Sequence, residues 1–205
     1  MNLFIFDRFP MTPYRLVFAL LALLTLLLGG CSRQDVPTAA NPVKREISIE
    51  TVAAQAKGFA AGSLMSTNTV YVFFDPQCPH CGHLWEAALP LHKKTRFVWI
   101  PVALINATSA SQGAALLSAT SPVDLMSTHE ASLLAGKGGI SASSSVATDV
   151  EQAIKANTQL LNSFGAESVP FIVAKNQQSG LTISREGALT TAALVELLGL
   201  DPVAR

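Results

Sequence analysis

The chain is poor in cysteine and has no excess of charge of either sign. It contains three cysteines in 205 residues, Cys31, Cys78 and Cys81, and 14 acidic residues balance 14 basic ones. Balanced charge gives no electrostatic reason to expect a nucleic-acid partner, and we predict none. The sequence shows no internal repeat and no second C-x-x-C motif. What the sequence does contain is one N-terminal apolar segment and one cysteine pair.

The longest apolar stretch, residues 16–28, lies near the amino terminus behind Arg8 and Arg15. It is shorter than the roughly 20 apolar residues that a membrane-spanning helix needs. A basic segment, a short apolar core and small residues after it are typical of a secretory signal. We therefore predict that residues 1–30 are a signal peptide and that the protein is exported.

The end of this segment, Leu28-Gly29-Gly30-Cys31, resembles the lipobox of bacterial lipoproteins. In that family the cysteine becomes the lipidated first residue of the mature chain. The resemblance implies that Cys31 anchors the protein to a lipid bilayer on the periplasmic side of the cell envelope. Ser32 follows Cys31, which by the sorting pattern of lipoproteins favours the outer membrane over the inner one. A plain signal peptide, giving a soluble periplasmic protein, is the alternative.

The remaining chain divides into a tether and one domain. Residues 31–66 predict a lipid-anchored tether with a short N-terminal element, because residues 32–42 are rich in proline and small polar residues. Within this part, residues 44–50 predict a short strand and residues 51–65 a short helix. Residues 67–205 predict the domain itself, and the chain after the signal is long enough to bury its own core.

The domain contains alternating strand and helix patterns. Apolar runs rich in β-branched and aromatic residues predict strands, and apolar residues at helical spacing predict helices. In chain order we expect strand, helix, strand, helical insertion, strand, strand and helix at residues 70–74, 78–92, 96–104, about 108–158, 168–174, 181–185 and 190–198. This order, β-α-β, insertion, β-β-α, predicts an α/β thioredoxin-like fold.

The sequence Cys78-Pro79-His80-Cys81 lies where the strand of residues 70–74 gives way to a helix. A C-x-x-C at such a turn is typical of a thioredoxin-like redox site. A disulfide across two residues closes too small a loop to restrain the unfolded chain much. In an oxidising compartment the pair therefore fits a redox-active disulfide better than a structural one.

Each residue of the motif has an expected role. Cys78 is the expected nucleophile, because helix N–H groups and the helix dipole favour its thiolate by up to ~2 kcal/mol. His80 is expected to stabilise the same thiolate, and Pro79 to fix φ where the helix needs no N–H donor. Cys81, one turn further on, is the expected resolving thiol.

Metal binding and a passive disulfide are the alternatives to redox chemistry. Haem attachment requires C-x-x-C-H, but Gly82 follows the second cysteine. Cys78, Cys81, His83 and His92 are suitable zinc ligands, yet they lie on one short helix, where closing four ligands is geometrically strained. We therefore predict no metal and no cofactor.

Three further positions are singled out. Asp75, just before the motif, is a candidate proton relay to Cys81 or a helix cap. Val169-Pro170 precedes a strand of the β-β-α half, where thioredoxin-like folds carry a cis-proline facing the redox pair, so we expect a substrate-binding loop there. His129, in the insertion, is expected to be a surface or packing residue.

Together these residues resemble the Dsb family of bacterial periplasmic thiol-disulfide proteins, and in particular the catalytic domain of its DsbC/DsbG group. Residues 73–81 resemble the strand and active-site turn of that group, and residues 129–139 its helical insertion. Pro79-His80 is also the inner dipeptide of DsbA, the oxidant of the family. The resemblance implies a disulfide oxidase or isomerase that acts on thiols and disulfides of exported proteins. It also implies a membrane redox partner that resets the cysteine pair.

One departure from that group concerns its N-terminal dimerisation domain. Fewer than about forty residues separate Cys31 from the first core strand, too few for such a domain. The resemblance therefore gives no support for the group's dimer or for the efficient isomerase action that depends on it, and the oligomeric state stays open. A second class of function stays open beside the enzyme: a non-catalytic chaperone of the same fold, or a metal-handling lipoprotein that uses the Cys/His cluster.

Overall fold

The structure is a computed structural model that describes residues 46–201. The predicted signal peptide and lipobox, and residues 31–45 of the predicted tether, lie outside the described residues. Within residues 46–201, no helix is both long and apolar enough to cross a membrane. The elements in chain order are α2 (Ile49–Gln55), β1 (Phe59–Gly62), β2 (Thr69–Phe74), α3 (Pro79–Ala88), the 3₁₀ turn η1 (Leu89–Leu91), β3 (Arg96–Pro101), α4 (Ala107–Ser118), α5 (Pro122–Leu134), α6 (Thr148–Ser163), β4 (Phe171–Lys175), β5 (Thr182–Glu186) and α7 (Thr191–Leu198).

The five strands form one mixed sheet in the order β1-β3-β2-β4-β5. β2 lies at its centre, parallel to β3 and antiparallel to β4. β1 and β5 are antiparallel edge strands. The predicted order β-α-β, helical insertion, β-β-α is thus confirmed, with α4, α5 and α6 between β3 and β4.

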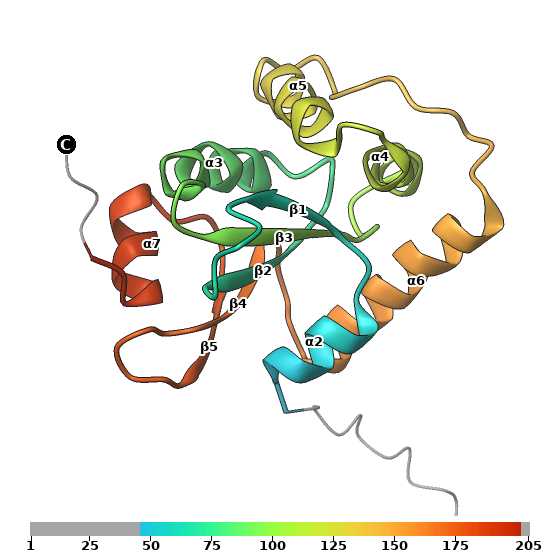
Figure 1. The fold of residues 1–205 in the computed structure, drawn as a ribbon. Helices are drawn as coiled ribbons and strands as arrows, with labels where there is room; N and C mark the ends of the chain where they lie inside the picture. Colours follow the sequence, from blue (N-terminus) through green and yellow to red (C-terminus); the bar gives the residue numbers. More distant parts are fainter. Residues whose placement is uncertain (1–45, 202–205) are drawn as a thin grey trace, which may run out of the picture. The chain divides into compact units, whose positions relative to one another are not determined.

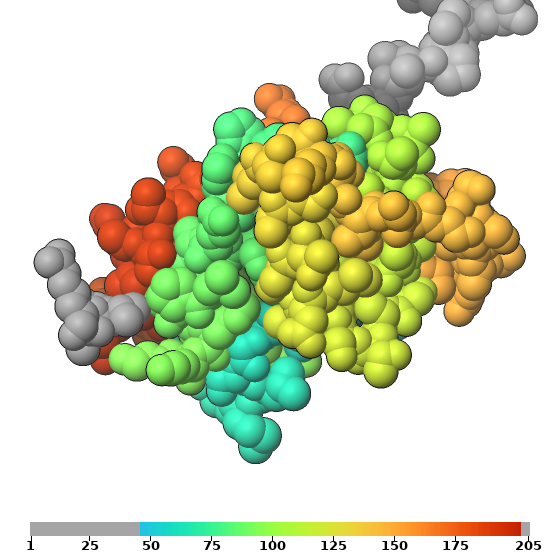
Figure 2. Space-filling view, turned by 90° about the horizontal axis from the view of Figure 1, so that it is seen from above, coloured from blue at the N-terminus to red at the C-terminus, as the bar shows by residue number. Residues whose placement is uncertain are grey.

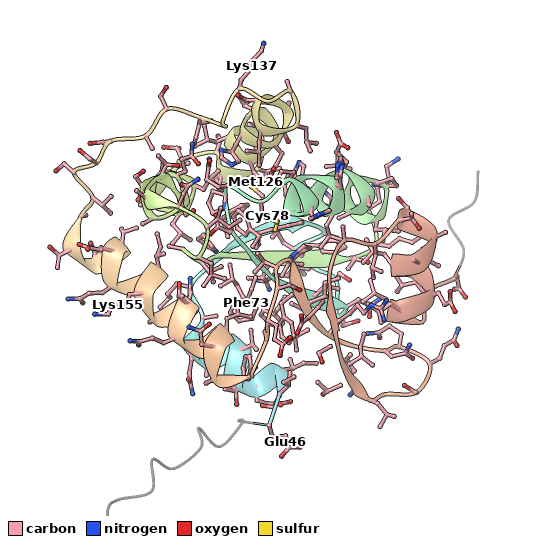
Figure 3. All side chains as sticks on the ribbon, turned by 180° about the vertical axis from the view of Figure 1, so that it is seen from behind. Glu46, Phe73, Cys78, Met126, Lys137 and Lys155 are labelled. Carbon is pink, nitrogen blue, oxygen red and sulfur yellow. The ribbon has the colours of Figure 1, made fainter. Side chains whose placement is uncertain are left out.

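Helices cover both faces of the sheet (Figure 1). Successive residues of β2 point to opposite faces, as the strand period of two requires. Val72 and Phe74 pack with α3, α5 and α7 in one core. Phe73 packs with α2 and α6 in the other. In Figure 3, Cys78 and Met126 lie on the side of the first core, and Phe73 lies on the opposite side.

Two elements near the start of the domain differ from the prediction. The strand predicted for residues 44–50 is wrong in the part that the structure describes: Ser48 caps a helix there, and its hydroxyl accepts a hydrogen bond from Thr51 N. The helix predicted for residues 51–65 ends early, and the strand β1 follows it. A cap residue and tertiary pairing override local alternation and alanine content here.

The path of β2 positions the redox motif. The strand is buried on both sides and ends at Phe74, and the chain turns through residues 75–77 into α3. α3 ends at Ala88 because Pro90 follows, and the chain continues as the 3₁₀ turn η1. Trp85 on α3 packs edge-on against Trp99 on β3, with ring centroids 5.1 Å apart, which fixes the helix on the sheet.

Candidate active site

Cys78 is the N-cap residue of α3 and Pro79 is its first helical residue. Cys78 has extended backbone angles, φ −98° and ψ 108°, and its carbonyl accepts a hydrogen bond from Cys81 N at 2.9 Å. The proline removes a donor where an α-helix has no intrahelical acceptor for it. The sulfur of Cys78 therefore lies at the positive end of the helix, as the motif predicts.

Both thiols are buried, but their pKa values shift in opposite directions. A hydrogen bond from the Cys81 thiol lowers the pKa of Cys78 to about 7, helped by the backbone N–H groups of Cys81 and His80, while burial and the charge of Asp75 oppose it. Burial raises the pKa of Cys81 well above its usual range, and the interaction with Cys78 adds to the effect. Cys78 is thus the thiol that ionises first, because its neighbour keeps the proton.

The chain segment opposite the sulfur comes from the start of β4. The thiol of Cys78 donates to the carbonyl of Val169 at 3.5 Å, across 91 positions of sequence. The Val169–Pro170 bond is cis, as the fold predicts. The structure therefore brings together the cysteine pair and the predicted substrate-binding loop, while the binding of substrate there stays a prediction.

The side chain of His80 is exposed, and so is Pro79. The contribution of His80 to the Cys78 thiolate comes from its backbone N–H. The expected role of its imidazole stays a prediction. His83 is also exposed, whereas His92 is half-buried against the rings of Trp85 and Phe97.

Asp75 is completely buried and holds two loops together. Its Oδ1 accepts from Gln77 N at 2.8 Å, and its Oδ2 accepts from Leu104 N at 2.6 Å and from Ile105 N at 2.9 Å. These bonds join the redox turn to the segment after β3. Asp75 does not cap α3, whose N-cap is Cys78. The proton relay through Asp75 stays a prediction, and its observed contacts are those of a loop anchor.

His129, expected at the surface or in packing, is fully buried beside the redox turn. Its Nδ1 accepts from Ile140 N at 3.2 Å, so its Nε2–H donates to the carbonyl of Pro76 at 2.6 Å. Gln112 on α4 donates to the carbonyls of Gly138 and Ile140. Through His129, these hydrogen bonds connect the loop after α5 to the turn that precedes Cys78.

Glu130 is the residue of this region that sequence reasoning missed. The buried residues of α5 are Met126, His129, Glu130 and Leu133, spaced as one face of a helix. An acidic residue at a core position of an amphipathic helix was the available signal. Burial raises the pKa of Glu130 to about 9, with repulsion from Cys78 and Glu86 adding to it.

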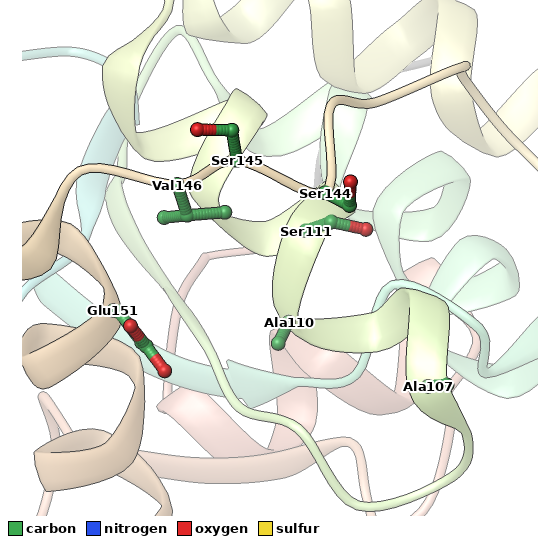
Figure 4. Close-up of a pocket in the computed structure, with 7 residues that line it drawn as sticks. All are labelled: Ala107, Ala110, Ser111, Ser144, Ser145, Val146 and Glu151. Atoms are coloured by element: carbon green, nitrogen blue, oxygen red, sulfur yellow. The ribbon is translucent and has the colours of Figure 1, made fainter.

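A separate hollow lies away from the redox pair, between α4 and the chain before α6 (Figure 4). Its volume is about 310 Å³, and small residues such as Ala110, Ser111 and Ser145 line most of it. Neither cysteine reaches it. In the described part of the chain, no three His, Cys, Asp or Glu side chains lie close enough together to hold a metal ion.

No protein-family model matches the chain. Two characterised relatives are the thiol:disulfide interchange proteins DsbG of Pseudomonas aeruginosa and of Escherichia coli. The first is 31% identical over 148 residues, covering 71% of this chain and 56% of that protein. The second is 30% identical over 114 residues, covering 55% and 45%. The chain thus spans about half the length of these relatives.

Solved structures agree on the fold. The catalytic domain of Proteus mirabilis ScsC superposes with a TM-score of 0.56 at 15% identity, over 73% of this chain and 96% of that domain. A periplasmic thioredoxin-like protein from Salmonella enterica gives a TM-score of 0.57 at 15% identity, over 76% and 97%. At such identity these likenesses establish the thioredoxin-like architecture alone.

Proposed function

We propose that this chain, a relative of the Dsb family of thiol:disulfide interchange proteins, is a thiol-disulfide oxidoreductase of the bacterial cell envelope. The observation that carries the proposal is the split between the two thiols. Cys78 has a pKa lowered to about 7 at a helix N-terminus, whereas Cys81 is buried and keeps its proton. Only the thiolate is a nucleophile, so the pair contains one attacking thiol and one resolving thiol.

The proposed exchange proceeds through a mixed disulfide. In oxidation of a substrate, a substrate thiolate attacks Cys78 Sγ, the Cys78–Cys81 bond breaks, and Cys81 leaves with the electron pair. A second substrate thiol then attacks the mixed disulfide, so the substrate gains a disulfide and the protein becomes a dithiol. Isomerisation begins from the reduced protein, when the Cys78 thiolate attacks a substrate disulfide. The carbonyl of Val169 lies 3.5 Å from Cys78 Sγ, which supports a role for the 169–170 loop in holding the substrate segment.

Equilibration with glutathione buffers tests this function. The oxidised and reduced full chains are incubated with mixtures of reduced and oxidised glutathione. Free thiols are then alkylated, and mass spectrometry measures the fractions of oxidised and reduced protein. We expect a two-electron equilibrium with a potential between about −120 and −270 mV, the range from strong oxidants to reductants of this fold. Cys78→Ala is the matched control and should show no such equilibrium, because it cannot form the Cys78–Cys81 disulfide. A pair that does not equilibrate with glutathione contradicts the proposal.

The proposed location and partners follow from the N-terminal sequence and the family resemblance. We propose that residues 1–30 are removed, that Cys31 is lipidated, and that the anchored domain faces the periplasm from the outer membrane. Its substrates are exported proteins with thiols or disulfides, and a membrane redox partner resets Cys78 and Cys81. Mass spectrometry of the mature N-terminus tests the anchor, because an unmodified Cys31 rejects it.

A further inference from the structure

Glu130 is a buried acid with no stabilising partner. Its side chain is 1% exposed, and neither carboxyl oxygen has a hydrogen-bond partner among residues 46–201. A buried polar group without a partner costs about 1–3 kcal/mol, and a charged one costs more. Folding gains nothing from an acid at this core position that an apolar residue would not supply. The position therefore calls for a functional explanation.

The carboxyl group lies against the redox helix. A Cβ atom placed on Gly82 would lie 2.6 Å from Glu130 Oε2, so the glycine leaves the space that the carboxyl group fills. Gly82 directly follows Cys81 in α3. Figure 2 shows α5, in yellow, beside α3, in green, on the surface of the molecule. The acid from the helical insertion thus reaches the turn of helix that carries the resolving cysteine.

The ionisable groups that face Glu130 belong to the site. Its charge acts on Cys81, and Cys78 and Glu86 act on it in turn. All three lie on α3 or at its N-cap. Its own helix adds His129, whose pKa is lowered by burial. α4 and β1, which also pack against α5, contain no ionisable side chain. The electrostatic interactions of Glu130 are therefore mainly with the cysteine pair.

We propose that Glu130 donates a proton to the Cys81 thiolate when the Cys78–Cys81 disulfide is opened. The substrate thiolate attacks Cys78 Sγ, and the bond between the two sulfurs breaks. Cys81 leaves with the electron pair, and the carboxyl proton of Glu130 goes to Cys81 Sγ. Solvent then returns a proton to the carboxylate. In the reverse direction the carboxylate takes the proton of Cys81 as that thiol attacks Cys78.

The acidities of the two groups fit this direction of transfer. The pKa of Glu130, raised by burial to about 9, keeps the carboxyl group protonated at neutral pH. Burial raises the pKa of Cys81 well above its usual range, so its thiolate is a strong base. Asp75 is less suited to the task, because three backbone N–H groups occupy its oxygens. The inference rests on the proposed exchange activity.

The test compares the purified full-length wild type with Glu130→Gln, Glu130→Asp and Asp124→Asn. Gln keeps the size of the side chain and loses the proton, Asp keeps the proton on a shorter stem, and Asp124 is an exposed acid on the same helix. Oxidised protein is mixed with a reduced dithiol peptide, and single-turnover opening of the disulfide is followed from pH 6 to 10 by intrinsic fluorescence.

We expect Glu130→Gln to be at least about 100-fold slower at pH 7 and to lose the fall in rate above about pH 9. Glu130→Asp recovers part of the rate, and Asp124→Asn matches the wild type.

An infrared difference spectrum between oxidised and reduced wild type supplies a readout that needs no variant. We expect a protonated-carboxyl band that changes with the redox state and that Glu130→Gln removes. Glu130→Gln with the rate and pH profile of the wild type, or an unchanged carboxyl region, overturns the proposal. A wild type that exchanges no disulfide with the peptide refutes the proposed function instead, so the two failures are distinguishable.

Discussion

The hydrogen bond from Cys81 to Cys78 is the largest cause of the low pKa of Cys78, so its removal has a calculable effect. At a pKa of about 7, about half of Cys78 is thiolate at pH 7. Cys81→Ala removes the donor and leaves burial and the backbone N–H groups of residue 81 and His80 in place, so the pKa of Cys78 should rise towards the ordinary value of about 8.5. At that value the thiolate fraction at pH 7 is about 3%, roughly a fifteenfold loss. Cys81→Ser keeps a donor in the same place and should leave the pKa near 7.

The rate of alkylation by iodoacetamide as a function of pH measures this pKa, because only the thiolate reacts. The two variants form a matched pair, since both lack the second thiol and differ in the hydroxyl group. The reasoning predicts separate titration curves for them. Superimposable curves, or a Cys81→Ala variant that still titrates near pH 7, would show that the helix N-terminus alone sets the acidity of Cys78.

Three other predictions concern the groups around the pair. Asp75→Ala leaves three backbone N–H groups without their acceptor, so denaturant titration should show a loss of about 1–3 kcal/mol in the free energy of unfolding, and Asp75→Asn a smaller loss. Burial lowers the pKa of His129, so only the unfolded chain gains its proton just below the ordinary value of about 6.5. The free energy of unfolding should therefore fall as the pH drops from 6.5 to 5.5, by at most about 1.4 kcal/mol per unit for this group, and less steeply in His129→Gln. Gly82→Ala pushes a methyl group against the Glu130 carboxyl and should lower the melting temperature. The same change at Gly180, which is exposed and has a positive φ, introduces backbone strain without that contact and serves as a comparison.

The fold was predictable where local signals and tertiary packing agree. The run Val70–Phe74 lies in a central strand, and the C-x-x-C motif needs the strand-to-helix turn that follows. β1 was missed because Phe59–Gly62 contains two alanines and a glycine, which are poor strand formers. It is a strand because it pairs with β3. Gly62 at the end of β1 has φ 88° and no room for a Cβ atom beside Thr95 O. That close approach depends on residues far along the chain, so local sequence could not reveal it.

The residues of the candidate site also fall into those that local sequence predicts and those that depend on tertiary contacts. Cys78, Cys81 and Pro170 were found because each belongs to a motif or to a fixed place in the fold. Glu130 lies against Gly82 on α3, and His129 bonds to the Pro76 carbonyl in the turn before α3, and the sequence does not place these segments beside α5. Their spacing on the buried face of α5 was visible, but which helix they would face was not.

Trapping of substrates in cells tests the central claim most directly. The full chain carrying Cys81→Ser keeps the acidic Cys78 and lacks the thiol that resolves a mixed disulfide. When acid-quenched, alkylated cells are analysed on non-reducing gels, we predict adducts of exported proteins linked through Cys78, released by reductant. The double variant Cys78→Ala, Cys81→Ser should give none. If Cys81→Ser accumulates no adducts through Cys78, the protein does not exchange disulfides as proposed.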